Sequence, residues 1–177
     1  NVWADENTLK RCADIVIRNS SSDFPITGIC HGSRNGFEVK KLKSLIANSD
    51  IIGTDISENA ANYGLYIWDF HDVNKEWVNN FDFVYSNSLD QSWKPKLAIE
   101  TWLEQLKPKG RLLLEHTDYH GPEYASEMDP FGVRPNVFPF ILTKWFGNRI
   151  SISHTKAKKK NMKLDSYVFE IAKTQQY

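Results

Sequence analysis

The stretch GICHGSRNGFEV, residues 28–39, joins a short apolar run to an amphipathic one. The apolar residues at 26–30 are typical of a buried strand, and the spacing of apolar residues over 36–48 predicts a helix. Gly32 and Gly36 lie between them, and glycine permits positive φ angles and a close approach of the backbone to a ligand. A tight turn and a ligand-binding loop both fit this stretch alone, because a single glycine cluster occurs in either.

The same alternation of strand and helix repeats along the chain. Four further apolar runs predict strands, and two segments between them predict helices: 51–55, 65–69, 81–86 and 111–115 for the strands, and 58–63 and 95–106 for the helices. These strands are continuously apolar rather than alternating, which is typical of a parallel sheet that is buried on both faces. The order of the elements therefore predicts an α/β domain of three layers.

The two ends of the chain complete the prediction of one domain over residues 1–177. An amphipathic pattern predicts a helix over 5–19, within an N-terminal helical segment at 1–22. Residues 117–137 are rich in Asp, His, Gly, Pro and Tyr, which predicts an irregular insertion on the substrate side. The remaining predicted elements are a short helix and a hairpin with an exposed loop: 139–146, then strands 149–154 and 166–172 around a loop at 156–163.

The composition is that of a globular protein without an obvious polyanionic partner. Hydrophobic residues make up 41% and charged residues 25% of the 177, and the formal net charge is zero, so the overall charge gives no reason to expect nucleic acid or an anionic membrane. No apolar run approaches the length of a membrane span, and the N-terminus lacks a signal-peptide pattern. Cys12 and Cys30 form no disulfide framework, so we expect a reducing, cytoplasmic location.

Polar residues follow each of the five predicted parallel strands: Cys30 to Gly36, Asp55 with Ile56, Asp69 with Phe70, Ser86 to Asp90, and Glu115 to His120. In an open parallel sheet, ligands bind beyond the carboxyl ends of the strands. A carboxylate at Asp55 can accept hydrogen bonds from both hydroxyls of a ribose, and one at Asp69 from an adenine amino group. The alternative is structural, since Asp55 to Ser57 also fits a helix cap.

Five segments together resemble one protein family: the glycine loop, Asp55, WDF at 68–70, SNSLD at 86–90 and LKPKGRL at 106–112. With these segments and the final hairpin, the chain resembles the class I, Rossmann-like S-adenosylmethionine-dependent methyltransferases over nearly its whole length. The resemblance implies a Rossmann-like three-layer sandwich, with a seven-stranded, mostly parallel sheet whose last strand is antiparallel. It also implies S-adenosylmethionine as the cofactor.

The resemblance further implies a set of cofactor-binding residues: Gly28, Cys30, His31, Gly32, Ser33, Asn35, Gly36, Asp55, Ile56, Asp69, Phe70, Ser86, Asn87 and Ser88. The glycine loop departs from the family pattern, because Gly28 stands for the usual acidic residue and Cys30 and His31 precede Gly32. That acid helps to hold the amino end of the cofactor, and Glu38 or a backbone group is a possible substitute. The departure keeps open a non-catalytic, methyltransferase-like binding or assembly domain.

His116 and Asp90 are the predicted catalytic residues. Transfer to oxygen needs a base, and His116 directly follows the fifth strand and titrates near neutral pH. The alternative is a histidine hydrogen-bonded to a loop carbonyl. The alternation of His116, Asp118 and His120 also fits a metal site, but the family's metal-dependent members use other ligands at other spacings, so no metal is expected.

The predicted acceptor is a small, partly anionic or sugar-like molecule, methylated at oxygen and held by Tyr119, His120 and Arg134. No nucleic-acid partner is expected, since the basic run at 156–160 has no interleaved aromatic residues. The Asn/Asp-Pro-Pro-aromatic motif for base amino groups is also absent after the fourth strand. A nicotinamide-dependent oxidoreductase is a third reading, against which the LKPKG segment and the final hairpin argue.

Overall fold

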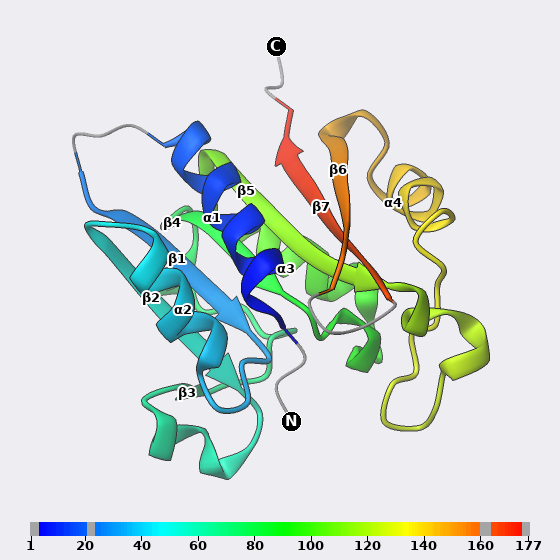
Figure 1. Cartoon of the computed structure of the whole chain (residues 1–177), viewed down its shortest axis with the longest axis horizontal. Helices are drawn as coiled ribbons and strands as arrows, with labels where there is room; N and C mark the ends of the chain where they lie inside the picture. The colour runs from blue at the N-terminus through cyan, green and yellow to red at the C-terminus, as the bar shows by residue number, and fades with distance from the viewer. Residues whose placement is uncertain (1–3, 21–23, 160–163, 175–177) are drawn as a thin grey trace.

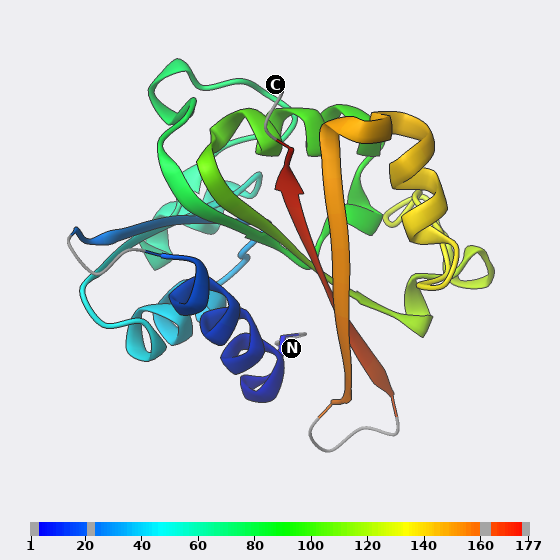
Figure 2. The ribbon, with the colours of Figure 1, turned by 90° about the horizontal axis from the view of Figure 1, so that it is seen from above.

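A computed structural model describes residues 4–20, 24–159 and 164–174. One twisted sheet forms the middle layer, and Figure 2 shows α1 and α2 on one face and α3 and α4 on the other. The predicted three-layer α/β architecture is therefore confirmed. Parts of the expected N-terminal segment (1–3 and 21–22) and of the expected hairpin loop (160–163) lie outside the described residues.

The helices and strands follow the predicted order (Figure 1). The strands are β1 (Ile26–His31), β2 (Ser49–Asp55), β3 (Tyr66–Ile67), β4 (Phe81–Ser86), β5 (Leu106–Thr117), β6 (Ile150–Lys158) and β7 (Asp165–Lys173). The α-helices are α1 (Glu6–Asn19), α2 (Phe37–Leu45), α3 (Pro95–Gln105) and α4 (Phe138–Phe146). Short 3₁₀ turns lie in the connections: η1 (Glu58–Tyr63), η2 (Lys75–Trp77), η3 (Leu89–Gln91), η4 (Asp118–His120), η5 (Pro122–Tyr124) and η6 (Gly147–Arg149).

All seven strands form one sheet in the order β3-β2-β1-β4-β5-β7-β6. The pairings from β3 to β5 are parallel, whereas β7 runs antiparallel to both β5 and β6. The final hairpin thus inserts its second strand beside β5, and the predicted seven-stranded sheet with an antiparallel last strand is confirmed. The order reverses at β1 and β4, which is where a sheet of this kind forms a crevice at its carboxyl edge.

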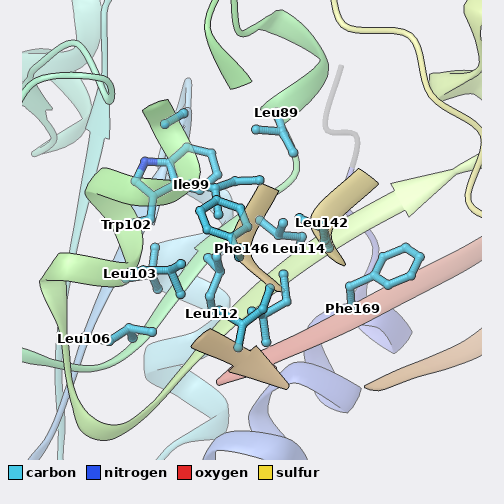
Figure 3. Packing of buried hydrophobic residues seen from close by; sticks show 14 of the residues in the cluster. Leu89, Ile99, Trp102, Leu103, Leu106, Leu112, Leu114, Leu142, Phe146 and Phe169 are labelled. Atoms are coloured by element: carbon cyan, nitrogen blue, oxygen red, sulfur yellow. The ribbon is translucent and has the colours of Figure 1, made fainter. Parts of the chain in front are cut away.

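Two hydrophobic clusters fix the helices to the sheet. On one face, α3 and α4 pack on β4, β5 and β7 around the fully buried Trp102, Leu112 and Phe169 (Figure 3). On the other face, α1 and α2 pack around Leu9 and Leu42. Because both faces of the central strands are buried, their continuous apolar runs have a direct structural cause. In the described residues, no helix has the length and apolar character needed to cross a bilayer.

The LKPKG segment lies at the start of β5, where Leu106 pairs with Phe81 and Arg111 with Phe83, so residues 107–110 lie outside the register with β4. β5 begins at Leu106, and its pairing with β4 shifts register between Phe81 and Phe83. A Cβ atom at Gly110 would lie 3.0 Å from the Phe81 carbonyl oxygen, so the close approach of the two strands requires glycine there.

The basic run before the hairpin tip is also not an exposed loop. Lys156 and Lys158 belong to β6, and both bind the Asp165 carboxylate of β7, at 2.8 and 2.7 Å. Lys159 is buried, and its Nζ lies 2.7 Å from Oε1 of Glu115. The predicted loop is therefore a strand over 156–158, in which Lys156 and Lys158 remain exposed. The prediction of a solvated lysine is wrong for Lys159, which is buried against Glu115.

Gly28 lies in the middle of β1 rather than in the glycine loop, so its expected place at the ligand is wrong. A Cβ atom at this position would lie 2.2 Å from the Phe83 ring on the adjacent strand. We expect Gly28→Ala to lower the free energy of unfolding by about 2 kcal/mol or more, because the core has no room for the methyl group. Urea unfolding measures the change. Phe83→Leu makes room for the new methyl group, so Gly28→Ala is expected to lower the free energy of unfolding less in that variant. An equal loss with and without Phe83→Leu would contradict this account.

Candidate functional site

A pocket opens where the carboxyl ends of β1, β2 and β3 lie side by side. It is lined by Gly32, Asp55, Ile56, Asp69, Phe70, His71, Gln91 and Trp93. Five of these eight residues were predicted from the sequence as a ligand site, and they come from three different strand ends. The structure thus brings together residues that are up to 38 positions apart (70 − 32) in the chain. We call this the first pocket.

The glycine loop forms one wall of the first pocket. Gly32 and Gly36 have φ angles of 69° and 71°, in the left-handed region that favours glycine. A Cβ atom at Gly32 would lie 2.5 Å from Oγ of Ser88, whose hydroxyl donates to the Gly32 carbonyl oxygen at 3.2 Å. The Ser33 amide donates to the Thr54 carbonyl at 2.9 Å, which holds the loop against β2. The positive φ angle and the contact with Ser88 therefore require glycine at position 32.

Asp55 ends β2 at the edge of the first pocket and is half-buried. Its Oδ2 accepts from the Arg34 amide at 2.8 Å, and its Oδ1 accepts from the Ser57 amide at 2.9 Å. Asp55 therefore has the structural role given above as the alternative, because its carboxylate holds the backbone of both neighbouring loops. Each carboxylate oxygen has a second lone pair, so these bonds leave Asp55 able to accept ligand hydroxyls.

Asp69 and two aromatic side chains form the opposite wall. Oδ1 of Asp69 lies 2.6 Å from Nδ1 of His71, and Nε2 of His71 lies 2.6 Å from the Ser92 hydroxyl. The His71 ring packs between Phe70 and Trp93, with centroid distances of 4.7 and 4.9 Å. This chain of contacts joins the loop after β3 to the loop before α3. It presents aromatic side chains beside a carboxylate.

His71, Gln91 and Trp93 are the lining residues that sequence reasoning missed. His71 directly follows the predicted Phe70, but its role depends on Ser92, which is 21 positions away. Trp93 precedes the helix-starting Lys94-Pro95 pair and carries no pattern that separates it from a core tryptophan. The side chain of Trp93 is 60% exposed, which distinguishes it from the fully buried Trp102.

Cys30 and His31 lie under the glycine loop and do not line the first pocket. The His31 ring is held by Thr54 Oγ1 and Gln105 Oε1, each at 2.8 Å, and stacks on Trp102. Burial lowers the pKa of His31 to about 4, so the ring is neutral at physiological pH. The expectation that these two side chains contact a ligand is therefore contradicted, and they support the loop from below.

The segment after β4 also serves the glycine loop. The buried Ser86 hydroxyl donates to the His31 carbonyl at 3.2 Å and accepts from the Ser88 amide at 3.1 Å. Asn87 is half-buried, so it is the one of these three predicted residues whose side chain retains clear exposure. Asn35 caps the start of α2, with its Oδ1 accepting from the Phe37 amide at 3.2 Å. These residues shape the loop, and their contact with a ligand stays a prediction.

His116 is buried and lines neither pocket, although it contacts His120, which lines the second pocket described below. Its Nε2 donates to the Val133 carbonyl at 2.6 Å, its Nδ1 lies 3.1 Å from Nδ1 of His120, and its ring stacks on Phe138. Burial lowers its pKa to about 4, so it is neutral at physiological pH. The prediction that His116 is a catalytic base is contradicted by this placement, which matches the alternative of a histidine bound to a loop carbonyl.

A second pocket lies on the other side of the η3 turn. It is lined by Asp90, Tyr119, His120, Gly121, Tyr124, Ala125, Asp129, Phe131 and Gly132. Burial, and then the charge of Asp129, raises the pKa of Asp90 to about 6. Arg134 is not among the lining residues, because its exposed guanidinium pairs with Glu123 at 3.4 Å. Asp90, Tyr119 and His120 thus meet in one pocket, whereas the contact of Arg134 with an acceptor stays a prediction.

Within the described part of the chain, no group of three or more His, Cys, Asp or Glu side chains is arranged to hold a metal ion. Cys12 and Cys30 are both free and buried. Burial raises the pKa of each thiol far above its ordinary value, so neither is a reactive thiolate.

Several solved structures share this fold. The plantazolicin methyltransferase BpumL, in complex with a triazolic desmethylPZN analog and SAH, superposes with a TM-score of 0.75 at 10% identity, over 97% of this chain and 87% of that one. A putative methyltransferase in complex with the Haloferax volcanii Trm112 methyltransferase activator gives a TM-score of 0.71 at 12% identity, over 97% and 92%. The citrinin polyketide synthase CMeT domain gives 0.71 at 14% identity, and there the chain spans only 52% of the matched chain.

These likenesses establish the fold, and the predicted Rossmann-like methyltransferase fold is confirmed. The same fold also occurs in the [4+2]-cyclase SpnF, with a TM-score of 0.61 at 19% identity over 83% of this chain and 59% of that one. No model of a known protein family matches the chain, and no curated protein matches it. The fold is thus established. The chemistry depends on the residues of the site, because one fold can carry several functions.

Proposed function

We propose that the chain binds S-adenosylmethionine in the first pocket and transfers its methyl group to an oxygen of a small-molecule or sugar-like acceptor. One observation carries this proposal: the residues expected from sequence to hold the nucleoside, on three different strand ends, line a single pocket. The fold supports it, because neighbours with the same fold include a methyltransferase solved with SAH.

The residues present fit the cofactor. Gly32 lines the pocket without a side chain, so the backbone of the glycine loop can lie close to a ligand there. Asp55 would accept hydrogen bonds from the two ribose hydroxyls, and Asp69 from the adenine amino group. Phe70 and Trp93 would offer apolar ring surface to the purine.

The cofactor supplies a methyl group on a positively charged sulfur, and the protein has to align an acceptor oxygen with it. Asp90 and Gln91 are consecutive in η3 and line the second and the first pocket, so the proposed acceptor site and the proposed cofactor site adjoin at this short turn. Asp90 takes the proton of the acceptor hydroxyl. With a pKa of about 6, its carboxylate is ionised at neutral pH and is more basic than an ordinary aspartate.

A non-catalytic binding or assembly domain is the second candidate. The buried His31 and His116 favour it, because burial keeps both rings neutral and neither ring lines a pocket. Such a domain would bind the cofactor without turning it over.

Calorimetry with S-adenosylhomocysteine tests the proposal, followed by methyl transfer from labelled S-adenosylmethionine to a panel of phenols, sugars and hydroxy acids. We expect micromolar to submillimolar binding and label transfer to at least one acceptor. Absence of binding at millimolar ligand would overturn the proposal, and binding without transfer to any acceptor would favour the second candidate.

Trp93 gives a direct test of where the nucleoside lies. We expect Trp93→Ala to weaken S-adenosylhomocysteine binding about tenfold, because stacking of a base on an aromatic ring contributes about 1–3 kcal/mol. Trp93→Phe keeps an aromatic face and is expected to retain most of the affinity. Equal affinities of the Ala variant, the Phe variant and the parent in calorimetry would remove Trp93 from the site.

A further inference from the structure

Two carboxylates, Asp90 and Asp129, line the second pocket. Burial raises the pKa of Asp90, and the charge of Asp129 raises it further, so the two acids lie close enough to repel each other. Among the described residues that line this pocket, none is lysine or arginine. A pocket with this charge distribution attracts a cation and repels an anion.

The basic side chains close to the second pocket do not neutralise these acids. The exposed Arg134 guanidinium lies 3.4 Å from the Glu123 carboxylate and does not line the pocket. The buried Lys159 acts on the His120 ring, but its ammonium lies 2.7 Å from Oε1 of Glu115. Burial is the main cause that lowers the pKa of His120 to about 2, so this ring adds no positive charge to the pocket.

One oxygen of the Asp90 carboxylate lacks a hydrogen-bond partner. Oδ2 lies 3.6 Å from Nε2 of His120, whereas Oδ1 is buried and accepts no hydrogen bond from the residues that the structure describes. A buried carboxylate oxygen without a partner costs free energy, and a donor on a bound ligand would remove this cost. A hydroxyl group of an acceptor is such a donor.

Aromatic rings accompany the two acids in the second pocket. Tyr119 and Tyr124 meet edge to face with their ring centroids 5.0 Å apart, and they are 47% and 52% exposed. Phe131 is a third aromatic residue in the lining. The face of an aromatic ring attracts an ammonium group, so acids and exposed rings together favour an organic cation over a neutral molecule.

Hydrogen bonds hold both acids in place before any ligand binds. The Phe131 amide donates to the Asp90 carbonyl at 2.9 Å, which ties the irregular insertion to η3. The Ser126 amide donates to the Asp129 carbonyl, and the Asp129 amide donates to Oγ of Ser126, both at 3.1 Å. The acidic side chains are therefore positioned by the fold of the insertion itself.

We propose that the second pocket selects a cationic acceptor, a hydroxylated amine whose ammonium group lies at Asp129 and whose hydroxyl group lies at Asp90. The inference rests on the proposed function, because it names the class of acceptor for that same site. The hydroxyl oxygen forms its new bond to the methyl carbon, the carbon–sulfur bond breaks with its electron pair left on sulfur, and Asp90 takes the hydroxyl proton. The sign of the charge is opposite to the partly anionic acceptor expected from the sequence.

Three phenols of similar size and different charge test this selection: tyramine is a cation, 4-ethylphenol is neutral and 4-hydroxyphenylacetate is an anion. Each is titrated at neutral pH into the protein saturated with S-adenosylhomocysteine, and amide NMR signals report the place of binding. We expect tyramine to shift the signals of Gly121 and Gly132, which line the second pocket, and to bind about fivefold or more tightly than the other two. Equal affinities of the three phenols, or no binding of tyramine at about 20 mM, would overturn the inference.

A variant at Asp129 makes the test specific to one charge. Asp129→Asn keeps the shape of the side chain and is expected to weaken tyramine binding about fivefold and to leave 4-ethylphenol within about twofold of the parent. Glu127→Gln removes an exposed acid of the same loop that does not line the pocket, and it is the matched control with no expected change. Unchanged tyramine affinity in Asp129→Asn, or an equal loss of both phenols, would contradict the assignment.

The outcomes separate this inference from the proposed function. If the parent does not bind S-adenosylhomocysteine, the proposed function fails, and the same titrations of the free protein still measure the charge preference of the second pocket. If the parent binds it and prefers 4-hydroxyphenylacetate, the inference is overturned and the predicted contact of Arg134 with an anionic acceptor is favoured.

A measurement without any acceptor tests the electrostatic basis. Because the charge of Asp129 contributes to the raised pKa of Asp90, Asp129→Asn is expected to lower that pKa from about 6. Carbon NMR of the Asp90 carboxyl group over a pH titration measures the change, with Glu127→Gln again as the control. An Asp90 pKa that is the same in the parent and in Asp129→Asn would show that the two acids do not interact, which would overturn the inference.

Discussion

Replacement of Lys159 by methionine is expected to lower the free energy of unfolding by about 3–5 kcal/mol. The Lys159 ammonium lies 2.7 Å from Glu115, and both side chains are almost entirely buried, with 1% and 0% exposed. Methionine fills a similar volume but leaves the Glu115 carboxylate without its cation in a low-dielectric environment. Urea unfolding, followed by far-ultraviolet circular dichroism, measures the loss.

Two variants make this result specific to the buried pair. Lys158→Met removes the neighbouring lysine, whose side chain is 69% exposed and pairs with Asp165, and it is expected to cost less than about 1 kcal/mol. Adding Glu115→Gln to Lys159→Met is expected to restore most of the stability, because the uncompensated charge is gone. A cost below 1 kcal/mol for Lys159→Met alone would show that Glu115 is not a buried carboxylate in solution.

Asp55→Ala is expected to raise the dissociation constant for S-adenosylhomocysteine about 100-fold. In the proposed complex the carboxylate accepts two ribose hydroxyls, and a hydrogen bond to a charged group contributes about 1.5–3 kcal/mol. Calorimetry on the purified protein measures the affinity.

The control for this variant lies on the same strand. Asp50→Ala changes an exposed aspartate at the opposite end of β2 and is expected to leave the affinity unchanged. Because Asp55 also holds the amides of Arg34 and Ser57, thermal unfolding of Asp55→Ala is measured alongside, and a loss of roughly 1 kcal/mol is expected. Unchanged affinity in a folded Asp55→Ala protein would exclude a ribose at this carboxylate.

The sequence alone predicted most of the sheet, because burial on both faces produces continuous apolar runs in β1, β4 and β5. It also predicted Asp55 and Asp69 at the first pocket, since the carboxyl ends of parallel strands meet at one edge. Each of these predictions needs only the residues of one strand and of the loop that follows it.

The errors arose where a contact between distant residues decides the role. Glu115 and His116 are adjacent at the end of β5 but point to opposite faces, so one meets Lys159 and the other stacks on Phe138. The strand-end position of His116 therefore predicted a base, although its ring is in the core. Lys159 looked like a solvated lysine because its acidic partner lies 44 positions earlier (159 − 115).

The position of β7 in the sheet has a consequence for how this chain is synthesised. β7 is the last described strand to leave a ribosome, yet it lies in the interior of the sheet, between β5 and β6. Until it emerges, β5 and β6 expose unpaired backbone edges, and such edges template aggregation. A nascent chain that stalls before β7 is therefore expected to need chaperone protection.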